Sequence, residues 1–254
     1  MQKVEANNDT ATFWEHLEEL RFVLIKTGAA TVLVGLAAFS FKDSLFSIIL
    51  APSRSDFVLF RWLKAEPFSL QMMNTQLTEQ FMIHVRVALY VGLMLVSPYI
   101  LYLLFAFISP ALYLNERHYG KIVAVSAYVL FMLGTIMNYF LIFPLTVRFL
   151  GTYQVSSDVA NMLTISNYVD TLMSMNMLMG IVFELPVVCW LAGRMGLLSR
   201  DTMRRFRRHA IVAILIVAAI ITPTTDMLTL IIVSMPIWML YEISIMLVRN
   251  KRKE

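Results

Sequence analysis

Long apolar runs, separated by short polar stretches, make up most of this 254-residue chain. Each run holds about 20 residues, enough helix to cross the roughly 30 Å hydrocarbon core of a bilayer. The pattern predicts an all-α polytopic membrane protein with six transmembrane helices, at about 22–41, 80–107, 121–143, 167–192, 209–222 and 227–248. No internal repeat or soluble domain is visible, so we expect residues 1–254 to form a single integral membrane domain.

The fifth predicted span is short. Residues 209–222 make about 21 Å of helix, so this span must thin the bilayer or sit recessed behind its neighbours. Alternatively, residues 203–208 extend the helix and their long basic side chains reach back to the interface. The sequence allows both interpretations. Prolines inside spans are tolerated in a bundle, and we assign structural roles to Pro98, Pro110, Pro144 and Pro186.

Composition and charge agree with this class. The chain is 59% hydrophobic and 15% charged, with a mean hydropathy of +0.70, which is too apolar for a soluble domain. The polar, acidic first dozen residues do not resemble a cleavable signal. Cys189 is the single cysteine, which excludes an internal disulfide and a multi-cysteine metal site.

The distribution of lysine and arginine predicts the orientation. The N-terminal segment, the second and fourth loops and the tail carry 14 of these 21 residues, and the other loops carry 5. Basic loops stay in the cytoplasm, so both termini are predicted to be cytoplasmic. The positive charge of such loops does not indicate nucleic acid. Lys26, Arg86 and Glu242 fall inside spans, and no role is assigned to them.

The segment before the first span, 12-TFWEHLEELR-21, is acidic. Thr12 and Glu15 have the spacing of a capping box, which predicts that a helix starts there. We expect an amphipathic helix on the cytoplasmic surface that runs into the first span. Its glutamates have two interpretations. They favour the helix dipole, with Glu18 paired to Arg21, or Glu15 and Glu19, four residues apart, form an anionic site.

A second cytoplasmic carboxylate, Glu116, lies in the loop 107-FISPALYLNERHY-119. Two carboxylates from separate segments near the interface would suit a pair of cations. Arginine fits best, because its planar guanidinium binds a carboxylate through two parallel hydrogen bonds and keeps its charge. Each charge-assisted bond contributes roughly 1.5–3 kcal/mol.

Glu184 is a carboxylate inside the fourth span. Ionised, it would cost about 2.5–3.5 kcal/mol on insertion scales, so it is expected to be protonated or paired. Asn176, Gly180 and Glu184 follow one another at intervals of four and form a polar stripe. The stripe predicts either a groove for a partner helix or an internal hydrogen bond that holds the bundle together. Asp226, in the short turn before the last span, is interpreted first as the N-cap of that helix.

Four sequence blocks together resemble those of the TatC family, a component of the twin-arginine (Sec-independent) protein translocase. They are Glu15-His16-Leu17-x-Glu19-Leu20-Arg21, Phe107-x-x-Pro110-Ala111-Leu112-Tyr113-x-x-Glu116-Arg117, Phe183-Glu184-x-Pro186 and Thr222-Pro223-x-x-Asp226. The blocks occur in the family's order, and the resemblance covers nearly all of the chain. It implies six helices, both termini inside, and short fifth and sixth spans.

The resemblance also implies a function. Family members receive the twin-arginine signal peptides of folded precursors and, with TatA- and TatB-type single-span partners, export them by the protonmotive force across the bacterial inner membrane. Self-association in a receptor complex is expected, without cofactor, metal or nucleic acid. The family's signal-contacting glutamates correspond to Glu19 and Glu116, flanked by Glu15, Arg117 and Phe107. Partner docking is implied for Glu184, Asn176 and Asp226, where the family has a functionally sensitive aspartate at the last of these positions.

Three positions depart from the family pattern. Leu230 stands where a glutamine is common, Val23 stands where a second basic residue is usual, and the first outer loop is longer, with 66-EPFSLQMMNTQLTEQF-81.

A rival function is an ion- or proton-coupled transporter with Glu184 as its ion site, but no duplicated half is evident. An enzyme is not expected, since the four histidines are scattered and no metalloprotease, serine-hydrolase or P-loop motif occurs.

Overall fold

Helices form almost all of the regular structure. The computed structural model describes residues 13–68, 70–108, 120–153, 162–222 and 226–248, except the side chains of 13–16, 108, 120 and 121. In these ranges five helical stretches are long and apolar enough to cross a membrane: Leu17–Phe39, Glu79–Phe107, Ile122–Thr152, Ile165–Arg194 and Met227–Leu247. They coincide with five of the six predicted spans. The all-α, multi-pass membrane class is therefore confirmed.

Two short helices form the region of the fifth predicted span. α9 (Arg200–Arg205) ends and α10 (Arg207–Ile221) begins on either side of Phe206. Arg207 and Arg208 therefore extend the predicted span, whereas residues 203–205 belong to the separate helix α9. At 15 residues α10 measures about 22 Å, and α11 (Met227–Leu247) has 21 residues. These two are the shortest of the six, which is compatible with the expected short fifth and sixth spans.

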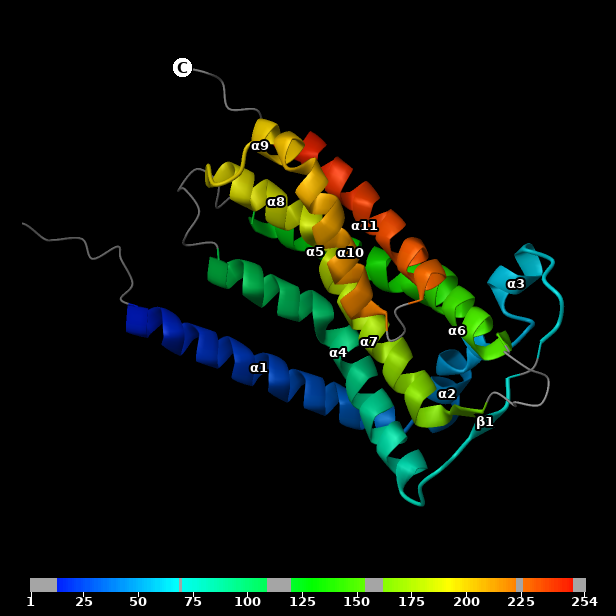
Figure 1. Ribbon diagram of the computed structural model, residues 1–254. Helices are drawn as coiled ribbons and strands as arrows, with labels where there is room; N and C mark the ends of the chain where they lie inside the picture. The colour runs from blue at the N-terminus through cyan, green and yellow to red at the C-terminus, as the bar shows by residue number, and fades with distance from the viewer. Residues whose placement is uncertain (1–12, 69, 109–119, 154–161, 223–225, 249–254) are drawn as a thin grey trace, which may run out of the picture.

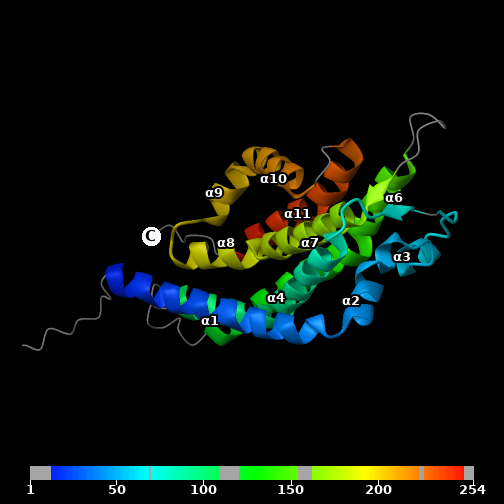
Figure 2. The same cartoon turned by 90° about the horizontal axis from the view of Figure 1, so that it is seen from below.

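The first four spans are longer helical stretches than the last two. α1 (Phe13–Phe39) and α4 (Glu79–Ile108) are each continuous, whereas the third span joins α5 (Gly120–Met137), a π-helical turn η4 (Asn138–Ile142) and α6 (Phe143–Thr152). The fourth joins α7 (Ile165–Phe183) and α8 (Leu185–Arg194). Figure 2 shows α1 at one edge of the bundle, α9 and α10 at the opposite edge, and α7 between them.

The third span is longer than predicted, since it continues past residue 143 to Thr152. Pro144 does not end it, because this proline falls in the first turn of α6, directly after the π-helical turn. Proline is tolerated in a first helical turn. Pro98 lies inside α4 as predicted, and the Ser97 hydroxyl donates to the Met94 carbonyl at 2.7 Å. That carbonyl is the one that Pro98 leaves without an N–H partner, so the helix continues.

The long first outer loop is folded. It contains α2 (Lys42–Ile49), a 3₁₀ turn η1 (Ala51–Ser53), α3 (Val58–Trp62) and β1 (Met72–Met73), which pairs in parallel with β2 (Leu163–Thr164). Two tyrosines of the bundle hold the end of α2: the Tyr139 hydroxyl donates to the Ile48 carbonyl at 2.6 Å, and the Tyr168 hydroxyl donates to the Ile49 carbonyl at 3.0 Å. The loop is therefore fastened to the third and fourth spans.

Two distinct ends result from this arrangement (Figure 1). We call the end where α1 and α10 begin and α4, α8 and α11 end the charged end, because the arginines of the α8–α10 connection lie there. The opposite end, which carries α2, α3 and β1, is the loop end. Between them, many large apolar side chains on the outside of α1, α5 and α10 are exposed, as expected for a surface that faces lipid.

Candidate functional site

The acidic start of α1 lies at the charged end. α1 begins at Phe13, one residue after the predicted capping threonine, and runs without a break into the first span. Leu17, Glu18 and Glu19 are exposed there. Thr12 is outside the described residues, as is the side chain of Glu15. A helix through this segment into the first span is confirmed, capping by Thr12 stays a prediction, and residues 17–19 form an exposed, acidic surface.

The end of α4 reaches the same end of the bundle (Figure 1). Phe107, half-buried, is the next-to-last residue of this helix. Pro110, Glu116 and Arg117 follow it in the chain and lie outside the described residues. The structure therefore brings Glu19 and Phe107 to one end, and the convergence of Glu19 with Glu116 stays a prediction.

Glu184 lies at the junction between α7 and α8. Pro186, in the first turn of α8, has no N–H for the helical ladder, and the chain bends between the two helices there. Both carboxyl oxygens of Glu184 are covered by neighbouring atoms, and neither forms a hydrogen bond with the described residues. A buried polar group without a partner is unusual and requires an explanation. One interpretation of the sequence was that Glu184 stabilises the bundle through an internal hydrogen bond. No such hydrogen bond is formed with the described residues.

The rest of the predicted polar stripe is closed off. Asn176 is buried and its Oδ1 accepts from Nδ2 of Asn138, in η4, at 2.7 Å. A Cβ on Gly180 would lie 2.6 Å from the Phe131 ring of α5. Contrary to the prediction of an open groove along the stripe, Asn176 and Gly180 pack inside the bundle. The intramembrane polar contact of Asn176 is made within the chain, and Glu184 is the member of the stripe whose polar atoms have no partner among the described residues.

Asp226 caps the last span. Its Oδ1 accepts a hydrogen bond from the backbone N–H of Thr229 at 2.8 Å. This N–H belongs to the first turn of α11, where backbone donors have no carbonyl partner within the helix. The N-cap interpretation is therefore confirmed. The functional sensitivity that the resemblance implies for this position stays a prediction.

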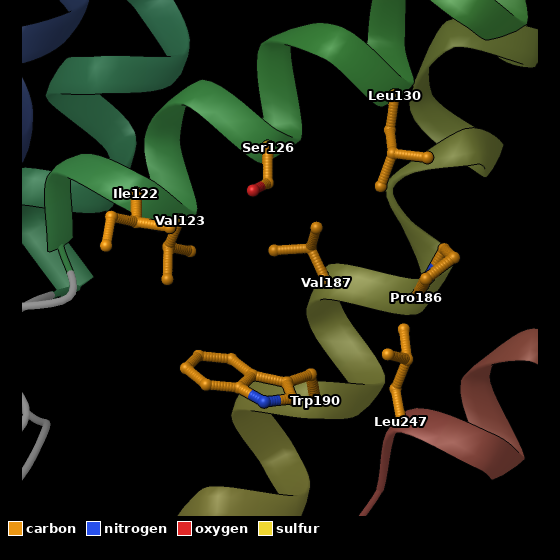
Figure 3. Close-up of a pocket in the computed structure, with 8 residues that line it drawn as sticks. All are labelled: Ile122, Val123, Ser126, Leu130, Pro186, Val187, Trp190 and Leu247. Atoms are coloured by element: carbon orange, nitrogen blue, oxygen red, sulfur yellow. The ribbon is translucent and has the colours of Figure 1, made fainter.

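An apolar cavity of about 230 Å³ lies beside the α7–α8 bend, towards the charged end. It is lined by Ile122, Val123, Ser126 and Leu130 of α5, by Pro186, Val187 and Trp190 of α8, and by Leu247. Figure 3 shows the α5 and α8 side chains facing each other across this space. Its walls are apolar apart from the Ser126 hydroxyl and the Trp190 indole N–H, so the space would fit a hydrophobic group better than an ion.

Two ion pairs were missed by the sequence interpretation. Arg86 of α4 binds both carboxylate oxygens of Asp170 of α7, at 2.8 and 3.0 Å, and Arg207 of α10 binds Glu242 of α11 at 2.6 Å. Arg86 and Asp170 are each only a few residues from the loop end of their helices, so the two side chains lie at a similar depth. Within the described ranges, no group of three His, Cys, Asp or Glu could hold a metal ion.

Comparison with known proteins decides the family. The family model described as "Sec-independent protein translocase protein (TatC)" matches residues 15–236. The chain belongs to the TatC family. A TatC protein of Blattabacterium sp. subsp. Periplaneta americana is 32% identical over 248 residues, which cover 92% of this chain and 93% of that protein.

Two crystal structures of a TatC described as the twin arginine translocase receptor are similar to this chain. One has a TM-score of 0.74 at 32% identity, covering 92% of this chain and 97% of the other. The second, in the detergent DDM, has a TM-score of 0.76 at 31% identity, covering 92% and 100%. The agreement extends over the whole length of the TatC structures, so it includes the arrangement of the spans.

The departures from the TatC pattern are accommodated by packing. Val23, in place of a second basic residue, is buried against the bundle. Leu230, in place of glutamine, packs half-buried against the core. Apolar side chains at these two positions therefore contribute to packing, and neither alters the exposed surface at Glu19. TatC membership does not favour the rival interpretation as an ion-coupled transporter.

Proposed function

We propose that this protein is the receptor component of a twin-arginine protein translocase. It binds the twin-arginine signal peptides of folded precursors and, with TatA- and TatB-type single-span partners, exports them using the protonmotive force. The observation that carries this proposal is the match to two structures of the twin arginine translocase receptor over 97–100% of their length.

The charged end is proposed to face the cytoplasm, with the protein in a bacterial cytoplasmic (inner) membrane. Six arginines of the described residues lie between the last turn of α8 and the first turn of α10 at this end: Arg194, Arg200, Arg204, Arg205, Arg207 and Arg208. An excess of basic residues is typical of cytoplasmic loops. Because α1 begins and α11 ends at the charged end, both termini would be cytoplasmic.

Glu19 and Glu116 are proposed to bind the two adjacent arginines of the signal peptide. The exposed position of Glu19 at the charged end supports access from the cytoplasm. Glu15, Arg117 and Phe107 flank the site in the proposal. Guanidinium groups fit carboxylates through two hydrogen bonds, and lysine does not reproduce this geometry, so the site distinguishes a twin-arginine from a twin-lysine peptide.

A photocrosslinking residue at Leu17, exposed and within the same turn of α1 as Glu19, tests this function. With the protein in nanodiscs, we expect strong labelling of a twin-arginine signal peptide and little labelling of its twin-lysine variant. The same residue at Leu33, exposed in the second half of α1, is the matched control and should label neither peptide preferentially. Equal labelling of both peptides at Leu17 would indicate a general acidic surface instead of a receptor site.

Glu184 is proposed as a docking point for a single-span partner. Its carboxyl oxygens form no hydrogen bond in the described residues, so a partner helix that displaces the side chains covering them and supplies a donor would satisfy a group that is costly in lipid. The adjacent cavity, lined by Pro186, Val187 and Trp190, offers space for an apolar side chain of the same partner. Asp226 is proposed as a second partner contact through its position in the outer turn.

Replacement of Glu184 by leucine should reduce co-purification of TatA- and TatB-type partners about 3- to 30-fold, since a hydrogen bond between membrane helices contributes roughly 0.6–2 kcal/mol. Glu184→Gln, which keeps a donor and an acceptor, should retain most of the recruitment. Signal-peptide crosslinking should be unchanged in both variants. Undiminished partner recovery with leucine at this position would remove the docking role.

A further inference from the structure

The short helix α3 in the outer loop has one face buried and one face open. Phe57 and Phe60 are 7% and 1% exposed and pack edge to face with ring centroids 6.4 Å apart. On the opposite side, Val58, Trp62 and Leu63 are 63%, 80% and 47% exposed. A tryptophan side chain is seldom so exposed on a surface that faces water. The exposed side of α3 is therefore expected to contact lipid or another protein surface.

The depth of α3 along the third span is that of a membrane boundary. The Phe57 ring stacks on the Phe140 ring, with centroids 5.8 Å apart and planes at 18°. Phe140 lies 18 residues after Ile122, where the span begins at the charged end, and this corresponds to about 27 Å of helix. A hydrocarbon core is about 30 Å thick. With Ile122 at the charged-end boundary, the core ends near Phe140, and the rest of this apolar helical stretch, up to Thr152, continues beyond the core at the loop end.

The lipid-facing surface of the third span continues onto α3. Its exposed apolar residues follow one helix face at intervals of three and four: Val129, Leu133, Ile136 and Phe140. Phe140 is the last of this stripe and is also the residue on which Phe57 stacks. Figure 1 shows α3 beside α6, at the loop end of the same span. α3 thus packs, through Phe57, on the loop end of an exposed apolar surface that is expected to face lipid.

Two cations flank the exposed tryptophan. Arg61 and Lys64 are exposed, and among the described residues neither forms an ion pair. Lys64 has a φ of +49°, a left-handed conformation that favours glycine or asparagine. The Ala65 N–H donates to the Phe60 carbonyl at 3.0 Å and closes this turn. Position 64 is thus occupied by a lysine although its left-handed backbone favours glycine or asparagine. This lysine directly follows the exposed apolar residues Trp62 and Leu63.

We propose that residues 58–64 form an interfacial membrane anchor. Val58, Trp62 and Leu63 insert into the boundary between headgroups and acyl chains of the leaflet at the loop end, and Arg61 and Lys64 bind phospholipid phosphates. Tryptophan with neighbouring basic residues is the combination that lies in such a boundary. The anchor would hold the long outer loop against the membrane. This inference rests on the multi-pass membrane fold and is independent of the translocase function.

Site-specific fluorescence tests the anchor. In a Cys189→Ser background, Trp62→Cys carries the environment-sensitive fluorophore NBD, in nanodiscs of phosphatidylcholine and phosphatidylglycerol with one protein copy each. Leu77→Cys is the matched control, because Leu77 belongs to the same loop and is 100% exposed. We expect blue-shifted emission at position 62, quenching by lipids spin-labelled near the headgroup, and iodide quenching about threefold weaker than at position 77.

Iodide quenching of equal strength at positions 62 and 77 would place α3 in water and overturn the proposal. Protection that arises only in discs with two copies would also overturn it, because the surface would then be a contact between copies of this chain. A second measurement combines Arg61→Gln with Lys64→Gln and should increase iodide quenching at position 62. An unchanged value in that variant would overturn the assignment of the two cations to phosphates.

Discussion

Glu19→Gln should weaken the binding of a twin-arginine signal peptide by about one to two orders of magnitude. The substitution keeps the size and polarity of the side chain and removes its charge, so a charge-assisted hydrogen bond worth roughly 1.5–3 kcal/mol is lost. Glu19 is exposed on α1 at the charged end, so the substitution lies on a surface that a peptide can reach. The dissociation constant of a fluorescent signal peptide for the protein in nanodiscs measures the effect.

The neighbouring Glu18 provides the control. It is exposed on the same turn of α1 and carries the same charge, so Glu18→Gln reproduces the general loss of negative charge without removing the proposed contact. We expect Glu18→Gln to change the dissociation constant by less than about threefold, as for a screened surface charge. If both substitutions weakened binding to the same extent, the peptide would be attracted by the acidic surface as a whole.

Gly92→Ala should destabilise the protein by about 1–3 kcal/mol, as overpacking of a close contact typically does. α4 meets α1 at this residue: a Cβ on Gly92 would lie 2.7 Å from the Thr31 carbonyl oxygen, 2.7 Å from the Gly35 nitrogen and 2.9 Å from the Gly35 Cα. All three are backbone atoms, so no rotamer change relieves the clash and the two helices must move apart. Thermal unfolding in a mild detergent, followed by loss of the monodisperse peak, measures the change.

Gly28→Ala is the matched control for this prediction. Gly28 lies on the same helix as Gly35, and a Cβ added there would meet nothing within 4 Å. Alanine has a higher helix propensity than glycine by about 1 kcal/mol, so this variant should be as stable as the natural protein or slightly more stable. A melting temperature of Gly92→Ala that matches that of Gly28→Ala would show that α1 and α4 do not approach as closely as their backbones indicate.

Local signals in the sequence were sufficient for the class of fold and for several details. Apolar runs predicted the five long membrane-crossing helices, because the length of such a run depends on the sequence alone. Asp226 was interpreted as an N-cap, and it accepts from the N–H three residues on, a contact that depends on neighbours in the chain. The four blocks that contain Glu19, Glu116, Glu184 and Asp226 indicated the family, which the comparisons confirm.

The third span and the ion pairs depended on information that no single stretch contains. The span continues beyond Pro144 because a π-helical turn, which begins at Asn138, precedes that proline. Asn138 is in turn bonded to Asn176, 38 residues away. The pairing of Arg86 with Asp170 joins residues 84 positions apart. Such contacts exist only once α4, η4 and α7 are packed together, so their sequence signals were too weak to predict them.

The sequence by itself determined which stretches form helices, roughly where they begin and end, and which residues share a helix face. Only the tertiary structure decided which of those faces meet another helix. Asn176, Gly180 and Glu184 form one polar stripe by spacing, yet α5 and η4 cover the first two, and Glu184 is left without a hydrogen-bond partner in the described residues. The physical reason is that spacing along a helix is a local property, whereas the burial of a side chain depends on the neighbour that packs against it.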